Sequence, residues 1–313
     1  MGMKVLLHVG LPKTGTTSIQ YALTESRERI QHSGVWYPKA GISGGTHGHH
    51  ALAWALYDGD YDLAERLLAS MMEESVLCNA AMMVISTERF SFLDNVGVEW
   101  LWTRLGDARI VIYLRNPCDF LESLLSQRIK HSTPRRKKWS GTVEEFLEEN
   151  LSLCDYFALC SRWASVFGWR SLDIRVYDEL KSGGRLLPDF AEVIGLTEGA
   201  LMSAAVHRAN AGPGAQATRA KLMLNRIESS MPGRVGKTKL WARLRKMIGS
   251  SSMMSRILNL IPYQWVEDVR FNAEQSLRIE KYACINKRLA ENASVCGSVK
   301  HLYECSATSG REH

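Results

Sequence analysis

No apolar run in this sequence approaches the roughly 20 residues that a membrane-spanning helix needs. The apolar stretch near the N-terminus ends at Pro12 and Lys13 without a small-residue cleavage site, so we expect no secretory signal. The seven cysteines are scattered and form no Cys-x-x-Cys pair, which argues against a zinc site and against a disulfide framework. These absences favour a cytoplasmic protein in a reducing environment.

The composition is that of a globular protein, with 45% hydrophobic and 23% charged residues in a chain of 313. The net charge of +6 is unevenly distributed. Residues 208–256 contain eleven Lys or Arg and one acidic residue, whereas the rest of the chain contains 28 basic and 32 acidic residues. This basic segment predicts an anionic partner, such as the inner face of a membrane in a peripheral contact, or an anionic glycan. We expect no nucleic acid, because no zinc finger, RNP pattern or basic zipper is present.

Short apolar runs alternate with helical patterns over the first two hundred residues. Strands are expected at residues 4–9, 80–86, 109–114 and 171–177, and helices at 16–32, 49–56, 61–74, 117–131 and 143–167. This alternation predicts an α/β fold, a single domain with a central, mostly parallel sheet flanked by helices. Residues 1–205 are expected to form this core, and residues 206–313 a helical, basic part packed on it or covering it.

The loop after the first strand, from Gly10 to Thr17, carries the strongest functional signal. Its two glycines permit a tight turn in which backbone N–H groups converge, and the following helix adds the positive end of its dipole. Lys13 adds a charge, and Thr16 and Thr17 add hydroxyls, so the loop predicts a P-loop-like cradle for a phosphate group. A Walker A motif needs lysine directly after the second glycine, but Thr16 follows Gly15. We therefore expect a nucleotide site without a metal.

At these residues the chain resembles the sulfotransferases that use 3′-phosphoadenosine 5′-phosphosulfate (PAPS). Their phosphosulfate loop has this form, and a second block places an arginine at a strand end eight residues before a serine, as in Arg115 and Ser123. The resemblance implies that these two residues bind the 3′-phosphate, and a guanidinium and a hydroxyl suit that group. It also implies a loop that binds the 5′-phosphosulfate, formed by Lys13, Thr14, Gly15, Thr16 and Thr17.

The resemblance is closer to the bacterial carbohydrate-type branch than to the cytosolic phenol and steroid enzymes. It implies PAPS as co-substrate, no metal, and a carbohydrate or glycolipid acceptor. A Gly-x-x-Gly-x-x-Lys pattern at residues 233–239 matches the cofactor-closing motif of the cytosolic branch only in part, because the preceding Arg-Lys pair is missing.

Sulfuryl transfer to a hydroxyl needs a cation for the leaving phosphate and a base for the acceptor proton. Lys13 is the natural cation. Glu88 follows the second buried strand, where parallel strands present residues to a ligand, and is one candidate base. The other lies in the cluster His47, His49 and His50, and His50 is favoured because it begins a helical pattern.

Two polar residues in the strands are weaker candidates. Ser86 is a candidate for orienting a substrate, because it ends the second buried strand. His8 lies inside the first strand and is expected to be a core histidine rather than a catalyst.

Two other classes of function remain open at this point. A divergent P-loop kinase or nucleotide hydrolase would require magnesium and prefer ATP. A non-catalytic module binding lipid or nucleic acid through residues 208–256 would keep its binding after Lys13→Ala and lose it steeply with salt.

Overall fold

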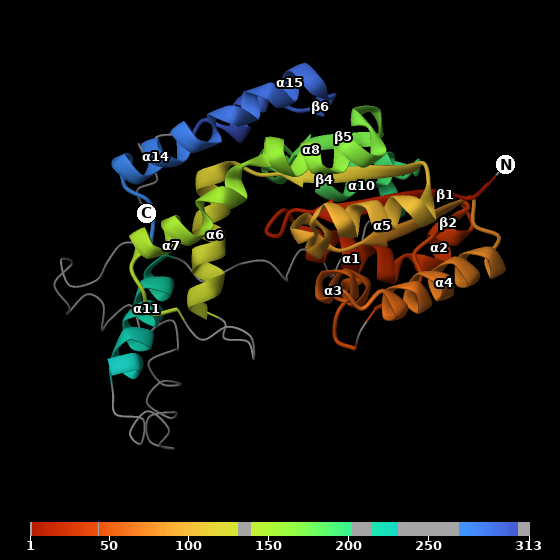
Figure 1. Ribbon diagram of the computed structural model, residues 1–313, viewed down its shortest axis with the longest axis horizontal. Helices are drawn as coiled ribbons and strands as arrows, with labels where there is room; N and C mark the ends of the chain where they lie inside the picture. The colour runs from red at the N-terminus through yellow and green to blue at the C-terminus, as the bar shows by residue number, and fades with distance from the viewer. Residues whose placement is uncertain (1, 43, 131–138, 202–214, 231–268, 306–313) are drawn as a thin grey trace. The chain divides into compact units, whose positions relative to one another are not determined.

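A computed structural model describes the whole chain except residues 1, 43, 131–138, 202–214, 231–268 and 306–313 (Figure 1). The chain divides into two compact units. The sheet unit comprises residues 1–116, 155–210 and 283–304, and the helical unit comprises residues 117–154, 211–282 and 305–313. This division differs from the one expected near residue 205, because the chain enters and leaves each unit more than once.

The sheet unit is built on six strands in the order β2-β3-β1-β4-β5-β6, and every neighbouring pair is parallel. The strands are β1 Lys4–Gly10, β2 Val35–Trp36, β3 Met82–Ser86, β4 Ala108–Leu114, β5 Leu172–Val176 and β6 Val295–Cys296. This confirms the predicted α/β fold with a parallel sheet flanked by helices. The sequence analysis missed β2 and β6, because a two-residue strand leaves no readable hydrophobic period.

Helices connect the strands of this unit. They are α1 Thr16–Glu25, α2 Arg27–Gln31, α3 His50–Asp58, α4 Tyr61–Leu77, α5 Asn95–Leu105, α8 Tyr156–Phe167, α9 Tyr177–Ser182, α10 Leu186–Val193 and α15 Leu289–Asn292. Leu6 of β1, Ile19 and Leu23 of α1, Val111 of β4 and Phe190 of α10 are buried in one hydrophobic cluster. Helices therefore shield the central strands, which explains why β1 reads as a continuous apolar run rather than an alternating one.

Two expected helices are each divided in the structure. The helix expected over residues 16–32 is interrupted at Ser26, between α1 and α2. The helix expected over residues 143–167 becomes α7 Val143–Asn150 and α8, separated by the short 3₁₀ segment Leu151–Cys154. Asp155 explains the second division, because its side chain accepts the Ala158 N–H and so caps a new helix.

The helical unit contains α6 Pro117–Lys130, α7, α11 Ala215–Ser230 and α14 Ala273–Ala283 among its described residues. The side chain of Asn225 on α11 donates hydrogen bonds to the carbonyls of Ile129 and Trp139. Glu144 on α7 accepts hydrogen bonds from Gln275 and Arg278 on α14. Polar side chains thus join helices that are distant in sequence.

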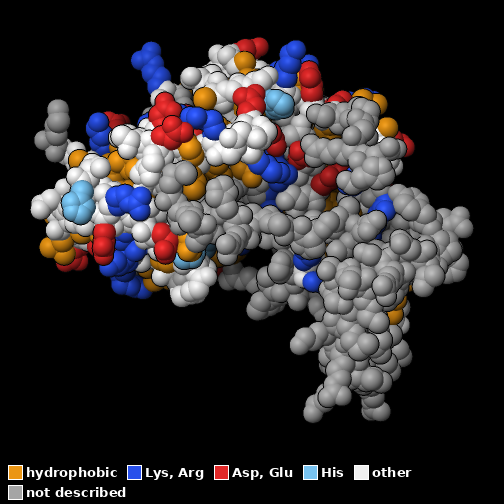
Figure 2. Space-filling model, turned by 180° about the vertical axis from the view of Figure 1, so that it is seen from behind, with side chains coloured by type: hydrophobic (Ala, Val, Ile, Leu, Met, Phe, Trp, Pro, Cys, Tyr) orange, Lys and Arg blue, Asp and Glu red, His pale blue; other side chains and the backbone are white. Residues whose placement is uncertain are grey.

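Most of the basic segment lies outside the described residues. Of residues 208–256, the structure describes 215–230, and the partial motif at 233–239 falls entirely in the part that is not described. On the face drawn in Figure 2, described acidic and basic side chains are intermingled. The predicted membrane contact of residues 208–256 therefore stays a prediction. No helix in the described ranges is long and apolar enough to cross a bilayer.

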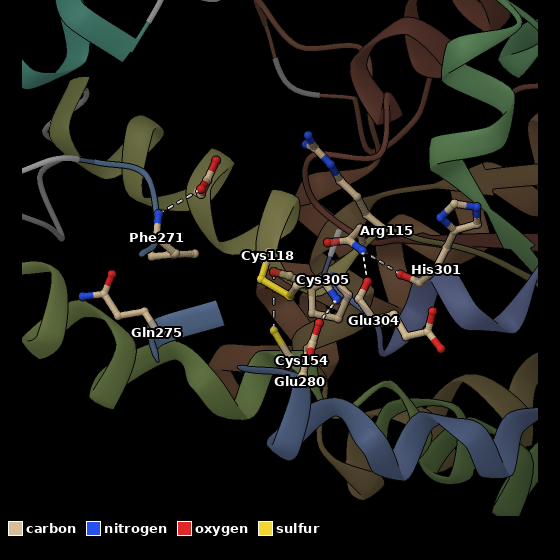
Figure 3. Close-up of a disulfide and its surroundings, with 12 residues drawn as sticks. Arg115, Cys118, Cys154, Phe271, Gln275, Glu280, His301, Glu304 and Cys305 are labelled. Atoms are coloured by element: carbon tan, nitrogen blue, oxygen red, sulfur yellow. Dashed lines mark hydrogen bonds between the residues drawn. A yellow bond between two sulfur atoms is a disulfide. The ribbon is translucent and has the colours of Figure 1, made fainter. Parts of the chain in front are cut away.

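A disulfide joins Cys118, in the first turn of α6, to Cys305, and both residues belong to the helical unit (Figure 3). The backbone N–H of Cys305 also donates to Glu280 of α14. The expectation that a disulfide framework is unlikely did not foresee this bridge. The two residues are 187 positions apart, and sequence spacing cannot reveal such a pairing, because the Cα atoms come within 5.7 Å only in the folded chain.

We expect reduction of this disulfide to lower the free energy of unfolding by about 2–5 kcal/mol, because the bridge restricts a long loop of the unfolded chain. Urea denaturation with and without dithiothreitol measures the change. A Cys118→Ser/Cys305→Ser variant, as the control, should match the reduced protein and should not respond to reductant. Thiol titration in denaturant should find the five free cysteines before reduction and all seven after it. Seven thiols in the untreated protein would contradict the bridge.

Candidate active site

Three of the predicted functional residues lie just after neighbouring strands of the sheet. Strands β3, β1 and β4 are adjacent and parallel, so their carboxyl ends share one edge of the sheet. The loop containing Lys13 follows β1, Glu88 follows β3 and Arg115 follows β4. This edge is where open parallel sheets bind their ligands.

The loop after β1 presents a row of unpaired backbone donors. The N–H groups of residues 14–17 form no hydrogen bond with any described residue. Lys13 and Gly15 both have left-handed backbone conformations, with φ of 69° and 74°. The left-handed φ at Gly15 favours glycine there, and a Cβ atom at this position would also crowd the side chain of Leu186. The loop is therefore shaped to direct several N–H groups toward an anion.

The threonines of the loop have different environments. Thr14 is buried, and its hydroxyl donates to the Leu11 carbonyl at 2.6 Å, so this side chain shapes the loop. Thr16 is also buried, whereas Thr17 is exposed. A bound phosphate would therefore contact Thr14 through its backbone N–H, and Thr17 has the most accessible hydroxyl.

Arg115 braces the loop after β1. Its Nη1 donates to the Lys13 carbonyl at 3.1 Å, and its Nε lies 3.7 Å from Asp178 Oδ1. Its guanidinium also lies 5.7 Å from the centre of the Tyr177 ring. A cation is thus held beside the loop. Ser123, its expected companion, lies half-buried on α6 in the helical unit.

The structure brings the two candidate bases together. His50 Nδ1 lies 2.8 Å from Thr87 Oγ1 and 3.9 Å from Glu88 Oε2. Gln20 on α1 donates to the same Glu88 oxygen at 3.2 Å. Glu88 begins the 3₁₀ segment η1 Glu88–Phe92, which approaches β1 so closely that a Cβ atom at Gly10 would lie 2.8 Å from Glu88 Cα. Gly10 thereby permits the carboxylate to sit beside the loop.

The environment of His50 suits a proton acceptor. Burial lowers its pKa, the Glu88 carboxylate partly opposes that shift, and the Arg89 cation adds to it. Its Nε2 forms no hydrogen bond with the described residues. His50 is therefore neutral near pH 7, with Nδ1 held by Thr87 and Nε2 available to a substrate proton.

The other polar candidates serve the structure. Ser86 is buried and its hydroxyl bonds to Nδ1 of the buried His8 at 2.8 Å, so it is not placed to orient a substrate. This also confirms His8 as a core residue. His49 is buried, with Nδ1 accepting the Ser86 N–H and Nε2 at 3.0 Å from the Pro38 carbonyl, which defines a neutral ring. His47 accepts the Tyr37 hydroxyl through its backbone carbonyl.

These two buried histidines predict a pH dependence of stability. Burial lowers the pKa of His8 to about 3 and that of His49 to about 4, each from 6.5. Below pH 6.5 the unfolded chain binds more protons at these two histidines than the folded chain does. The free energy of unfolding is therefore highest above pH 6.5 and falls as the pH is lowered toward 4. Each histidine contributes a slope approaching about 1.4 kcal/mol per pH unit.

Urea denaturation between pH 7 and 5 measures this slope. We expect His49→Gln to reduce this slope by up to about 1.4 kcal/mol per pH unit, which corresponds to one proton. Replacing the exposed His32 with Gln, as the control, should leave the slope unchanged. An unchanged slope in His49→Gln would contradict the assignment of a neutral buried ring.

Sequence reasoning missed the residues that orient the site. Gln20 is a buried polar residue on the inner side of an amphipathic helix, and Thr87 follows a buried strand directly. Tyr177 and Asp178 follow β5 at the same edge of the sheet. Polarity at a strand end is the signal that would have found Thr87 and Asp178, whereas only the folded chain brings Gln20 to Glu88. Within the described ranges, no three His, Cys, Asp or Glu side chains cluster so that they could hold a metal ion.

Solved structures to which this chain is similar include two sulfotransferases. One is a sulfotransferase from Alicyclobacillus acidocaldarius, with 16% identity and a TM-score of 0.40 over 76% of this chain and 100% of that one. The other is the sulfotransferase domain of the Synechococcus PCC 7002 olefin synthase, with 11% identity and a TM-score of 0.37 over 90% of this chain and 94% of that one. No family model and no curated protein matches the chain.

Proposed function

We propose that this protein is a sulfotransferase that uses PAPS and sulfates a hydroxyl group of a carbohydrate or glycolipid. The observation that carries the proposal is that two different groups of residues lie at one edge of the sheet. A loop with unpaired N–H groups and Lys13 lies at the same sheet edge as the His50–Glu88 pair. The first suits a phosphosulfate, and the second suits removal of a proton from an acceptor.

PAPS would supply an activated sulfuryl group, and the chain would position it. The acceptor oxygen forms a bond to sulfur while the bond from sulfur to the phosphate oxygen breaks, which leaves 3′,5′-adenosine bisphosphate. His50 or Glu88 receives the hydroxyl proton, and Lys13 with the loop N–H groups stabilises the charge that develops on the leaving phosphate. Arg115, braced beside the loop, supplies a fixed positive charge for the nucleotide.

Calorimetry of nucleotide binding tests the donor assignment. We expect 3′,5′-adenosine bisphosphate to bind without metal and more tightly than ATP with magnesium. A preference for ATP with magnesium would overturn the proposal in favour of a kinase or hydrolase. Failure of both nucleotides to bind would overturn it in favour of a non-catalytic role for the chain.

Arg115→Ala provides a second arm of this experiment. Charge-assisted hydrogen bonds contribute about 1.5–3 kcal/mol, so the variant should bind the bisphosphate roughly 10- to 100-fold more weakly. Arg170→Ala, which removes an exposed arginine from the 3₁₀ segment Trp169–Ser171, is the matched control and should bind normally.

A further inference from the structure

Arg89 is an exposed cation held in place by an aromatic ring rather than by an acid. Its guanidinium lies 4.9 Å from the centre of the Trp54 ring, and it forms no ion pair with any described residue. Several other arginines of the sheet unit are paired with carboxylates, such as Arg104 with Glu65 and Arg109 with Asp173. The charge of Arg89 is therefore both oriented and uncompensated within the described part of the chain.

This cation lies beside the proposed acceptor-activating pair. Arg89 follows Glu88 directly in η1, and its charge reaches His50 strongly enough to lower the pKa of that ring. Trp54 lies one helical turn after His50 on α3, so the two side chains share one side of the helix. Tyr57, 61% exposed, packs edge-on against Trp54 with 5.8 Å between ring centres. Aromatic surface and the Arg89 cation thus adjoin the groups that would meet the acceptor hydroxyl.

We propose that Arg89 binds a carboxylate or phosphate on the acceptor, so that the protein selects negatively charged glycans over neutral ones. The guanidinium of arginine can bind either a carboxylate or a phosphate through two parallel hydrogen bonds. Because the Trp54 ring already holds this guanidinium in place, it loses less conformational entropy when it binds the anion. This inference rests on the proposed function, because it describes the acceptor side of the same site. Arg89 is the specificity-determining residue, and Trp54 is its positioning residue.

Binding of matched oligosaccharide pairs tests the inference. The probes are a chondroitin oligosaccharide and its carboxyl-reduced form, and a phosphorylated mannose oligosaccharide and its dephosphorylated form. Each is titrated into the full-length protein, with and without saturating 3′,5′-adenosine bisphosphate. We expect at least one charged probe to bind tenfold or more tightly than its neutral partner, and the pair that shows the difference identifies carboxylate or phosphate.

Variants assign that difference to Arg89. Arg89→Gln should abolish the preference while leaving bisphosphate affinity unchanged, and Arg89→Lys should retain part of it. Arg66→Gln, which removes an exposed arginine from α4 with the same change in charge, should keep the full preference. Equal binding within both pairs, binding of no probe, or a preference that survives in Arg89→Gln would each overturn the inference. Failure of the bisphosphate to bind would instead count against the proposed function, and the titrations without nucleotide would still report on Arg89.

Discussion

Replacing Glu88 with Gln or His50 with Ala should each lower kcat by about 10²- to 10⁴-fold, the usual contribution of a positioned acid or base. His50 Nδ1 and Glu88 Oε2 lie 3.9 Å apart, at the same sheet edge as the loop after β1. Each substitution therefore removes one of the two groups that we propose accept the hydroxyl proton. Bisphosphate affinity should remain within about twofold of the wild-type value, because neither residue belongs to that loop. Sulfate transfer from labelled PAPS to an acceptor oligosaccharide measures kcat, and calorimetry measures binding.

The pH profile distinguishes the two residues. If His50 accepts the proton, the acidic limb of kcat/KM reports its pKa, which lies below the ordinary histidine value because the ring is buried. Glu88→Gln should move that limb to still lower pH, since the carboxylate raises the pKa of His50. Added imidazole should partly restore His50→Ala. Near-normal turnover in both variants would show that neither residue is the base.

Lys13→Ala should reduce transfer by about 10²- to 10³-fold, as expected for loss of one group that stabilises a leaving-group charge. It should also weaken bisphosphate binding by about 10- to 100-fold, because a charge-assisted contact to phosphate is lost. Lys13→Arg keeps the charge and should retain much of the binding. Transfer assays and metal-free calorimetry measure the two effects.

Lys13→Gly separates the charge of this residue from its backbone. Lys13 has a φ of 69°, a conformation that costs a residue with a Cβ on the order of 1 kcal/mol and costs glycine little. The glycine variant should therefore lose nucleotide binding as Lys13→Ala does, yet have a higher melting temperature than Lys13→Ala. Normal bisphosphate binding in either variant would remove Lys13 from the site.

Much of the site could be predicted from sequence because it is built on local signals. A glycine loop between a buried strand and a helix is recognisable without tertiary information, and the loop of Lys13 has the predicted position after β1. Glu88 was predicted from its place after a buried strand, and parallel topology gathers such positions at one edge. Arg115 was predicted from the resemblance to PAPS-dependent sulfotransferases. His50 was predicted from its place at the start of a helix. Position in the secondary structure was therefore enough to select three of these candidates, and Arg115 needed the resemblance as well.

The errors arose where local signals were weak or absent. Strands β2 and β6 are two residues long and are stabilised by pairing with their neighbours, so they carry no pattern of their own. Ser86 was considered for the site because it ends a strand, but the choice between substrate and His8 as its partner depends on packing. The Cys118–Cys305 bridge joins positions whose proximity depends on the path of the whole chain.

The sequence by itself determined the parallel α/β architecture and the glycine turn between β1 and α1, because hydrophobic period and glycine conformation act over a few residues. The tertiary structure alone decided that the two alternative bases form one pair. It also showed that Gln20 holds Glu88 and that Arg89 stacks on Trp54 beside them. These contacts join residues up to 68 positions apart, and they exist because parallel strand pairing brings separate loops to one edge of the sheet.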